Sequence, residues 1–342
     1  MSNPAWHMRR ALRLAEQGKG WTLPNPMVGA ILIKDGERIG EGYHSQYGAA
    51  HAEVEALQNV ATMHPNASTE GATLYVTLEP CCHQGKTPPC TKAIIAAGIS
   101  KVVIAVKDPS EKIDGKGIEE LRAAGIKVEV GLLEKDAREL NRFFFTFHEK
   151  KRPHITLKAA LSLDGKITTL KKNGSLFEKT RTALTGLPAQ RYSHALRHEH
   201  QAILVGSGTV ITDNPHLGTR HIKGRDPLRI ILTGERPIPK KSLIFRDKNI
   251  LILNDKTVSE MLGELYQKNI TSILVEGGHN IFASFLAAGI VDELQLFIAP
   301  IFLGENSLPF AELETPLILE QTHIRTLGKD LLIQAVPKFN IQ

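Results

Sequence analysis

All three cysteines of this 342-residue chain lie within a span of ten residues, and a His-Ala-Glu triplet precedes them. A zinc ion that carries out hydrolysis needs three protein ligands and one position left open for water, and one histidine with two thiolates is a set that it accepts. Nucleobase deaminases combine these ligands with a glutamate two residues after the histidine, which transfers protons without binding the metal. His51 and Glu53 match that half of the pattern. The feature restricts the fold, because segments far apart in the sequence must then converge on one ion.

The spacing of the cysteines departs from the deaminase pattern, since eight residues separate Cys81 from Cys90 instead of two. A disulfide between them is one alternative. A structural zinc site is another, with Cys82 or His83 as a fourth ligand. We expect Cys82 to be a small packed residue, because adjacent side chains point in different directions. Reduced thiols beside a His-x-Glu triplet favour a metal site. The predicted zinc ligands are His51, Cys81 and Cys90, and the predicted proton-transfer residue is Glu53.

Length and composition indicate an ordinary two-domain globular protein. A chain of 342 residues exceeds what one hydrophobic core usually holds. Hydrophobic residues make up 42% and charged residues 23%, which is typical of globular proteins in solution. We find no apolar run long enough for a membrane helix, and the first ten residues lack the apolar centre of a signal peptide. We therefore expect a cytoplasmic protein that does not bind membranes.

The net charge of +6 is confined to the second half of the chain. Residues 1–150 carry 18 basic and 18 acidic side chains, so the remainder carries 42 − 18 = 24 basic and 36 − 18 = 18 acidic ones. Such a surplus suits a phosphorylated ligand, although it also suits nucleic acid or simple solubility.

Alternating helix and strand patterns in the first half predict an α/β sandwich. Strands are expected at residues 28–33, 72–77, 101–106 and 126–130, with one more that follows the first and ends near residue 43. Helices are expected at 8–15, 52–62, 88–97, 118–124 and 138–148. His51 and Cys90 then lie near the starts of two helices, where the helix dipole stabilises a thiolate. We expect the first domain to cover residues 1–148 and a charged linker closed by proline to cover 149–153.

A second alternation fills the predicted domain 154–342. Strands are expected at residues 155–160, 202–205, 228–232, 250–253, 272–275 and 294–299, with helices near 188–197, 258–268 and 280–288. Glycines at 205–209 and 276–280 follow a strand and precede a helix, where backbone amides can approach a phosphate. A tight turn is the alternative at each. The full GxGxxG fingerprint is absent, so we do not expect a standard Rossmann site.

The first half resembles the bifunctional riboflavin-biosynthesis deaminase/reductase family in the runs 24–29 (PNPMVG), 51–53 (HAE) and 79–90. That family has the same eight-residue gap between its cysteines. The resemblance implies an N-terminal cytidine-deaminase-like α/β/α sandwich and a C-terminal dihydrofolate-reductase-like α/β domain. It also implies a binding site for the pyrimidine or its phosphate at Asn25, His44, His83 and Lys86. Ordinary turn or loop roles are the alternatives for these four residues.

The second half resembles the reductase domain of the same family in the runs 157–166, 208–215, 275–278 and 299–304. That domain uses NADPH. The resemblance implies a cofactor site formed by Ala160, Ala183, Thr209, Asp213 and the loop from Gly278 to Ser284, which includes His279 and Asn280. It implies a substrate site formed by Arg181, Arg197, Leu217, Arg220 and Glu276. Two arginines suit a phosphate, because their forked donors pair with its oxygens; an exposed ion pair is the alternative.

The chain departs from the family at two places in this half. The run 181–185 (RTALT) stands where the family has a Ser-Lys-Trp-Ile-Thr-like segment, so Ala183 replaces an expected aromatic residue. Thr233 stands where an aspartate commonly ends the strand. One alternative is therefore a deaminase whose C-terminal domain is impaired in reduction.

These observations predict two successive steps of riboflavin synthesis on one chain. The first is zinc-dependent deamination of 2,5-diamino-6-(5-phosphoribosylamino)pyrimidin-4(3H)-one, with one zinc ion per chain. The second is NADPH-dependent reduction of its ribosyl group to a ribityl chain. We expect a phosphorylated small molecule as the partner, no nucleic acid, and a homo-oligomer, either dimer or tetramer. A tRNA or nucleotide deaminase is the alternative, although aromatic residues for stacking are few at 6%.

Overall fold

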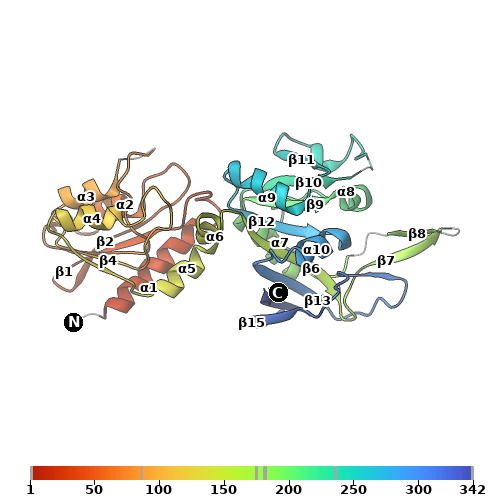
Figure 1. Ribbon diagram of the computed structural model, residues 1–342. Helices are drawn as coiled ribbons and strands as arrows, with labels where there is room; N and C mark the ends of the chain where they lie inside the picture. Colours follow the sequence, from red (N-terminus) through yellow and green to blue (C-terminus); the bar gives the residue numbers. More distant parts are fainter. Residues whose placement is uncertain (1–2, 86–87, 174–175, 180–182, 235–236, 340–342) are drawn as a thin grey trace. The chain divides into compact units, whose positions relative to one another are not determined.

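The structure is a computed structural model that describes residues 3–85, 88–173, 176–179, 183–234 and 237–339. The chain divides into two compact units, Met1–Lys151 and Arg152–Gln342 (Figure 1). The predicted linker at 149–153 begins inside a helix, because α6 (Arg142–Lys150) continues through residues 149 and 150. Each unit has its own sheet and its own hydrophobic core.

In the described part of the first unit, five strands form one sheet in the order β2-β1-β3-β4-β5. These strands are β1 (Gly29–Lys34), β2 (Glu37–Tyr43), β3 (Thr73–Val76), β4 (Lys101–Ile104) and β5 (Lys127–Val130). Strand β1 is antiparallel to both β2 and β3, whereas β3, β4 and β5 are parallel. The carboxyl ends of β3 and β4 therefore lie at the same edge of the sheet.

Helices cover both faces of this sheet. Successive side chains of a strand point to opposite faces, and these strands carry apolar side chains on both. On one face Leu32 and Leu74 pack with α2 (Ala52–Met63), α3 (Cys90–Ala96) and α4 (Lys116–Ala123). On the other face Ile31 and Tyr75 pack with α1 (Pro4–Ala15), α5 (Glu134–Leu140) and α6. The predicted α/β/α sandwich is confirmed.

The helix predicted at 138–148 is two helices, α5 and α6, which are separated at Asn141. The buried Asn141 side chain forms two hydrogen bonds with the Met27 backbone, accepting from its nitrogen at 2.8 Å and donating to its oxygen at 2.9 Å. These partners are 114 residues apart. A contact of this range has no local sequence signature, which is why the break was not predicted.

The main sheet of the second unit has eight strands in the order β11-β10-β9-β12-β6-β13-β16-β15. Six are parallel: β6 (His154–Ser162), β9 (Ala202–Gly206), β10 (Leu228–Thr233), β11 (Ile250–Asn254), β12 (Ser272–Gly277) and β13 (Glu293–Ala299). The hairpin of β15 (Ile318–Leu327) and β16 (Asp330–Lys338) continues the sheet: β16 pairs antiparallel with β13, and β15 pairs antiparallel with β16. A smaller antiparallel sheet contains β7 (Lys166–Asn173), β8 (Leu176–Lys179) and β14 (Ser307–Pro309).

Both faces of the large sheet are covered. Helices α9 (Val258–Gln267) and α10 (His279–Ala287) pack on the face that includes Ile273 and Val275. Helices α7 (Leu187–Glu199) and α8 (Ser207–Asp213) pack on the opposite face, through Leu274 and Ile203 respectively. The predicted C-terminal α/β domain is confirmed. The strands β7, β8, β14, β15 and β16 were not predicted, because they lack the alternation with helices that marked the parallel strands.

A buried ion pair fixes the first strand of the second unit. Asp292 accepts two hydrogen bonds from the Arg152 guanidinium, at 2.6 and 2.8 Å, and a third from the Ile155 amide at 2.9 Å. Only 7% of the Asp292 side chain is exposed. The carboxylate therefore ties the start of β6 to the start of β13.

Asp292→Ala is expected to destabilise the second unit by about 3 to 5 kcal/mol, because it leaves a buried guanidinium without its counter-charge. Faster hydrogen exchange of the β6 amides measures the loss. Glu314→Ala, at an exposed acidic residue of the same unit, is the control and should leave those rates unchanged. Equal protection of β6 in both variants would contradict the role given to Asp292.

Candidate functional site

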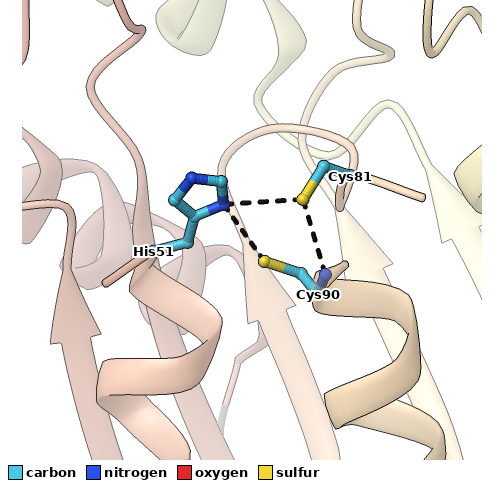
Figure 2. A group of neighbouring side chains, drawn as sticks. All are labelled: His51, Cys81 and Cys90. Carbon is cyan, nitrogen blue, oxygen red and sulfur yellow. Dashed lines mark hydrogen bonds between the residues drawn. The ribbon is translucent and has the colours of Figure 1, made fainter. Parts of the chain in front are cut away.

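His51, Cys81 and Cys90 come together although they lie on three separate segments (Figure 2). The His51 Nδ1 atom is 3.2 Å from the Cys90 sulfur and 3.5 Å from the Cys81 sulfur. The Cys90 amide donates a hydrogen bond to the Cys81 sulfur at 3.4 Å. Figure 2 shows the imidazole facing both sulfurs, with Cys90 at the start of a helix. One small volume is therefore lined by one nitrogen and two sulfur atoms.

The local packing explains why His51 reaches this position. His51 is the N-cap residue of α2, which lies directly on β2. A Cβ atom added at Gly42 would lie 2.4 Å from the Ala56 nitrogen, and one added at Gly40 would lie 2.4 Å from the Ala56 oxygen. These glycines permit the close approach of strand and helix. They thereby set where the start of α2, and with it His51, is placed.

The three side chains fit a zinc ion. Standard zinc bond lengths place a nitrogen and a sulfur ligand about 3.6 Å apart across a tetrahedral site, close to the two distances observed. All three cysteines are free thiols, so the disulfide alternative is not what the structure shows. Within the described ranges, no other group of three such ligand residues converges, and no fourth joins this one. The set therefore matches a catalytic zinc site with an open position.

Glu53 and Cys81 at this centre have pKa values shifted from their ordinary ones. Glu53 lies in the first turn of α2 and is only 3% exposed. Burial raises the pKa of Glu53 to about 7, and the Cys81 thiolate acts in the same direction. Hydrogen bonds from Cys90 and His51 lower the pKa of Cys81. The centre thus combines a thiolate with a carboxyl group whose pKa suits proton transfer near neutral pH.

Two of the four predicted pyrimidine-binding residues lie next to the centre. The Asn25 amide nitrogen is 3.3 Å from His44 Nε2, and the His44 ring centroid is 5.3 Å from that of His51. His44 Nδ1 is 3.0 Å from the Ala50 oxygen, which fixes the ring orientation. His83 is exposed on the loop between Cys81 and Cys90. Lys86 lies outside the described residues.

Asp108 is a further polar residue at this edge of the sheet, and the sequence reasoning missed it. It follows β4, is 3% exposed, and accepts a hydrogen bond from the Ser110 amide at 2.7 Å. Burial raises the pKa of Asp108 to about 6, and the His83 charge lowers it slightly. An Asp-Pro pair directly after a predicted strand was the available signal, since loops at the carboxyl ends of parallel strands often carry function.

In the second unit, Glu276 forms ion pairs with two cationic side chains. Arg197 on α7 donates to both Glu276 oxygens, at 2.7 and 2.8 Å, and Lys158 on β6 lies 3.6 Å from the same carboxylate. All three side chains are at most 14% exposed. Burial opposes ionisation of Glu276, but the Arg197 and Lys158 charges outweigh it and lower the pKa of Glu276 to about 2. Lys158 was not predicted as a site residue.

The loop with the other predicted substrate residues lies beside this cluster. Arg197 donates a third hydrogen bond, at 3.1 Å, to the oxygen of Gly218, which adjoins the buried Leu217. Arg220, two residues further on, is exposed. Arg197 is largely buried and bonds three of its N–H groups to Glu276 and Gly218, whereas Arg220 is the predicted arginine whose side chain faces solvent. Arg181 lies outside the described residues.

The predicted cofactor residues are placed at the carboxyl ends of neighbouring strands. Gly278 follows β12 and Thr209 follows β9, and a Cβ atom at Gly278 would lie 3.4 Å from the Thr209 hydroxyl. Ala160 lies on β6, the other neighbour of β12. Ligands in open α/β sheets bind at this edge. The remaining residues lie on helices that start there, Asp213 at the end of α8 and His279 with Asn280 at the start of α10.

The structure also describes Ala183 and Thr233, the two residues at which the chain departs from the family pattern. Ala183 is exposed, so no side chain there supplies an aromatic surface. The Thr233 hydroxyl at the end of β10 donates to the Asn254 side-chain oxygen, and it is therefore engaged within the sheet edge.

Comparison with known proteins assigns both units. Residues 1–106 match the family model "Cytidine and deoxycytidylate deaminase zinc-binding region", and residues 153–333 match "RibD C-terminal domain". The riboflavin biosynthesis protein RibD of Aquifex aeolicus is 40% identical, over 96% of this chain and 96% of its own. The chain belongs to the RibD family. RibD of Escherichia coli is 35% identical over 88% of this chain and 89% of its own.

Solved structures of RibD proteins share the whole architecture. RibD of Acinetobacter baumannii superposes with a TM-score of 0.89 at 31% identity, covering 98% of this chain and 99% of that one. The Thermotoga maritima diaminohydroxyphosphoribosylaminopyrimidine deaminase/5-amino-6-(5-phosphoribosylamino)uracil reductase superposes with a TM-score of 0.85 at 34% identity, covering 98% of both chains. As a member of the RibD family, this chain is a bifunctional deaminase and reductase of riboflavin biosynthesis. It has a zinc-binding deaminase domain and a reductase domain that uses a nicotinamide cofactor and acts on a small molecule.

One prediction about membranes is addressed by the structure. Among the helices in the described ranges, none combines the length and the apolar character required to cross a bilayer.

Proposed function

We propose that the first unit deaminates 2,5-diamino-6-(5-phosphoribosylamino)pyrimidin-4(3H)-one, and that the second unit then reduces the ribosyl group to a ribityl chain with NADPH. The observation that carries the proposal is the convergence of His51, Cys81 and Cys90 next to the buried Glu53. We also propose residues 1–148 and 154–342 as the functional domains, with one zinc ion per chain.

In the deamination, this chain supplies the ligands, the proton transfer and the contacts to the pyrimidine. Zinc bound by His51, Cys81 and Cys90 would lower the pKa of water and so provide the nucleophile near neutral pH. Glu53 accepts the proton of that water and delivers it to the amino group, which leaves as ammonia. Asn25 and His44 are within hydrogen-bond reach of one another, and we assign them to the edge of the pyrimidine. His83 and Lys86 are assigned to the remainder of the substrate.

In the reduction, NADPH supplies a hydride to C1 of the sugar, and the protein binds and orients the reactants. We assign the cofactor to the edge formed by Ala160, Thr209, Asp213 and the residues from Gly278 to Asn280, with Ala183 beside it. Glu276 is assigned to the sugar hydroxyls, because its carboxylate is held ionised by Arg197 and Lys158. We assign to Lys158, whose amine lies 3.6 Å from the Glu276 carboxylate, the donation of the proton that the sugar oxygen requires when the ring opens.

The phosphate of the second substrate is assigned to Arg220, together with Arg181. A guanidinium donates to a phosphate through two parallel N–H groups, and the parallel pair formed by Nε and Nη2 of Arg197 is already bonded to Glu276. Arg197 is therefore assigned to holding Glu276 in place next to the substrate, and Leu217 to packing against it.

We also propose that the protein acts in the cytoplasm as a dimer or tetramer, without nucleic acid or membrane as a partner. Strand β15 supports self-association: it lies at the edge of the eight-stranded sheet, and Ile318 and Ile324 on it are 56% and 64% exposed. An exposed edge strand presents backbone groups that can pair with another chain.

His51→Ala and Cys90→Ala are each expected to lower the zinc content from about one ion per chain to well below one, because each removes one of only three protein ligands. Elemental analysis of the purified protein measures it. Cys82→Ala is the matched control, since the neighbouring thiol is not part of the ligand group. Unchanged zinc in the first two variants would contradict the ligand assignment.

Product analysis tests the whole proposal. The purified chain is incubated with the diaminopyrimidinone ribosyl phosphate, with and without NADPH, and the products are identified by mass spectrometry. We expect the deaminated ribosyl compound without NADPH and the deaminated ribityl compound with it. Deamination without any reduction would favour a C-terminal domain impaired by Ala183. Ammonia release from tRNA or dCMP but not from the pyrimidine phosphate would favour the alternative substrates.

A further inference from the structure

Eight residues separate Cys81 from Cys90, so the distance between their sulfur atoms is not fixed by a short connection between them. In a C-x-x-C arrangement both sulfurs belong to one turn of the chain. Here Cys81 lies in the loop after β3, and Cys90 is the first residue of α3. Their separation must therefore be set by contacts made outside the residues that connect them.

Glu79 makes such contacts two residues before Cys81. Its side chain is buried, at 3% exposure, and its carboxylate accepts four backbone hydrogen bonds. One oxygen accepts from Asp108 at 3.2 Å and Gly115 at 3.1 Å, and the other from Gly117 at 3.0 Å and Ile118 at 3.2 Å. Gly117 and Ile118 belong to the first turn of α4, Gly115 is its N-cap residue, and Asp108 precedes it in the loop after β4. One carboxylate thus joins the Cys81 loop to the start of this helix.

Steric contact reinforces the junction. A Cβ atom added at Gly117 would lie 2.2 Å from the Pro80 oxygen. The first turn of α4 is therefore seated directly against the residue that precedes Cys81. No side chain larger than hydrogen fits between them.

The same helix also contacts the segment that carries Cys90. Glu120 on α4 accepts a hydrogen bond from the Thr91 hydroxyl at 2.9 Å, and it pairs with Lys92 at 2.7 Å. Thr91 is fully buried, and its amide donates to the Cys81 oxygen at 3.2 Å. Helix α4 is thus connected to both thiolate segments, to one through Glu79 and to the other through Glu120.

We propose that Glu79 is a positioning residue of the metal centre, which holds the Cys81 sulfur at its distance from the Cys90 sulfur by anchoring the Cys81 loop on α4. The proposal rests on the assignment of His51, Cys81 and Cys90 as the zinc ligands. It predicts that the preformed spacing of the sulfurs, and therefore the affinity for zinc, depends on a carboxylate that never contacts the metal. Residues that orient metal ligands typically change metal affinity by about 10- to 100-fold when substituted.

Glu79→Gln in the full chain tests the proposal. The amide nitrogen cannot accept the two hydrogen bonds that one carboxylate oxygen accepts, so the anchor is half lost at nearly constant volume. We expect the dissociation constant for zinc, measured by competition with a chromophoric chelator, to rise about tenfold or more. Glu119→Gln is the matched control: it makes the same change on α4, but its side chain is exposed, and its zinc affinity should equal that of the original chain.

Thermal unfolding of the zinc-free proteins separates positioning from a general loss of structure. The proposal requires weaker zinc binding in Glu79→Gln than in Glu119→Gln at equal stability of the first unit, which contains both residues and the metal centre. If Glu79→Gln does not fold, Glu79→Asp takes its place, because it keeps the charge but is one methylene shorter and cannot reach all four backbone donors. Zinc affinity equal to that of the original chain, in whichever of the two variants is folded, would overturn the proposal.

The zinc-ligand variants distinguish the possible failures. If Cys90→Ala retains its zinc, the ligand assignment itself is wrong, and the role of Glu79 is refuted with it. If Cys90→Ala loses zinc but Glu79→Gln binds it like the original chain, the site stands and only the positioning role is refuted.

Discussion

Glu53→Gln is expected to lower the rate of ammonia release by about 10²- to 10⁴-fold, the usual contribution of a general acid and base, while the zinc content stays unchanged. The reason is that Glu53 and the metal ligands have separate tasks. The glutamine keeps the size of the buried side chain but cannot accept a proton from water or return it to the amine. Steady-state ammonia assays together with elemental analysis measure both quantities on the same preparation.

Glu55→Gln is the control for this prediction, because it lies in the same first turn of α2 and removes the same charge. Its deamination rate and its zinc content should match those of the original chain. The reductase activity of Glu53→Gln, assayed with the deaminated substrate, should also be unchanged. Near-normal ammonia release by Glu53→Gln would show that another group transfers the proton.

Glu276→Gln is expected to reduce the kcat/KM of the reductase by about 10²-fold or more and to destabilise the second unit by about 3 to 5 kcal/mol, because two largely buried cations lose their shared counter-charge. Arg197 then lacks the partner that fixes its orientation, and Lys158 is left in an apolar environment near the Phe297 ring. NADPH oxidation measures the activity. Urea unfolding followed by far-ultraviolet circular dichroism measures the stability.

The stability that the Glu276 cluster contributes depends on pH, because the pKa of Glu276 is lowered to about 2. A carboxylate whose pKa is lower in the folded state stabilises the fold above its unfolded pKa of about 4.3, and this contribution is lost as the pH falls toward 2. Glu276→Gln should therefore be much less stable than the original chain at neutral pH, and the difference should shrink below about pH 4.

Glu264→Gln is the control for the reductase activity of Glu276→Gln, because it affects ion pairs nearer the surface. Its kcat/KM should equal that of the original chain.

The part of the metal centre that could be predicted from sequence is the part that local rules determine. His51 and Glu53 are two residues apart at the start of one helix, and Cys90 starts another, so their chemistry was recognisable before the fold was known. Cys81 was recognisable because it follows a clear strand. The parallel strands and their helices were equally accessible, since each is marked by its own apolar pattern.

What escaped prediction depends on residues far apart in the chain. The Arg197–Glu276 pair spans 79 residues, and the hydrogen bonds between Asn141 and Met27 span 114. Lys158 stood in a recognised sequence run, but only its proximity to Glu276 gives it a role. Glu79 likewise looked like part of a loop motif until its four backbone donors were located. Such pairings are set by the order of strands in the sheet, which apolar periodicity does not encode.

The close contact of Gly42 with α2 has a consequence for how variation in this protein is interpreted. A single methyl group at this position would push the helix away from the strand, and the displacement would be felt nine residues later in the sequence, at the imidazole. The lack of a side chain at this strand residue is therefore required both for the packing of α2 on the sheet and for the position of His51. A survey of tolerated substitutions that considered only active-site motifs would record the position as sensitive without finding the cause.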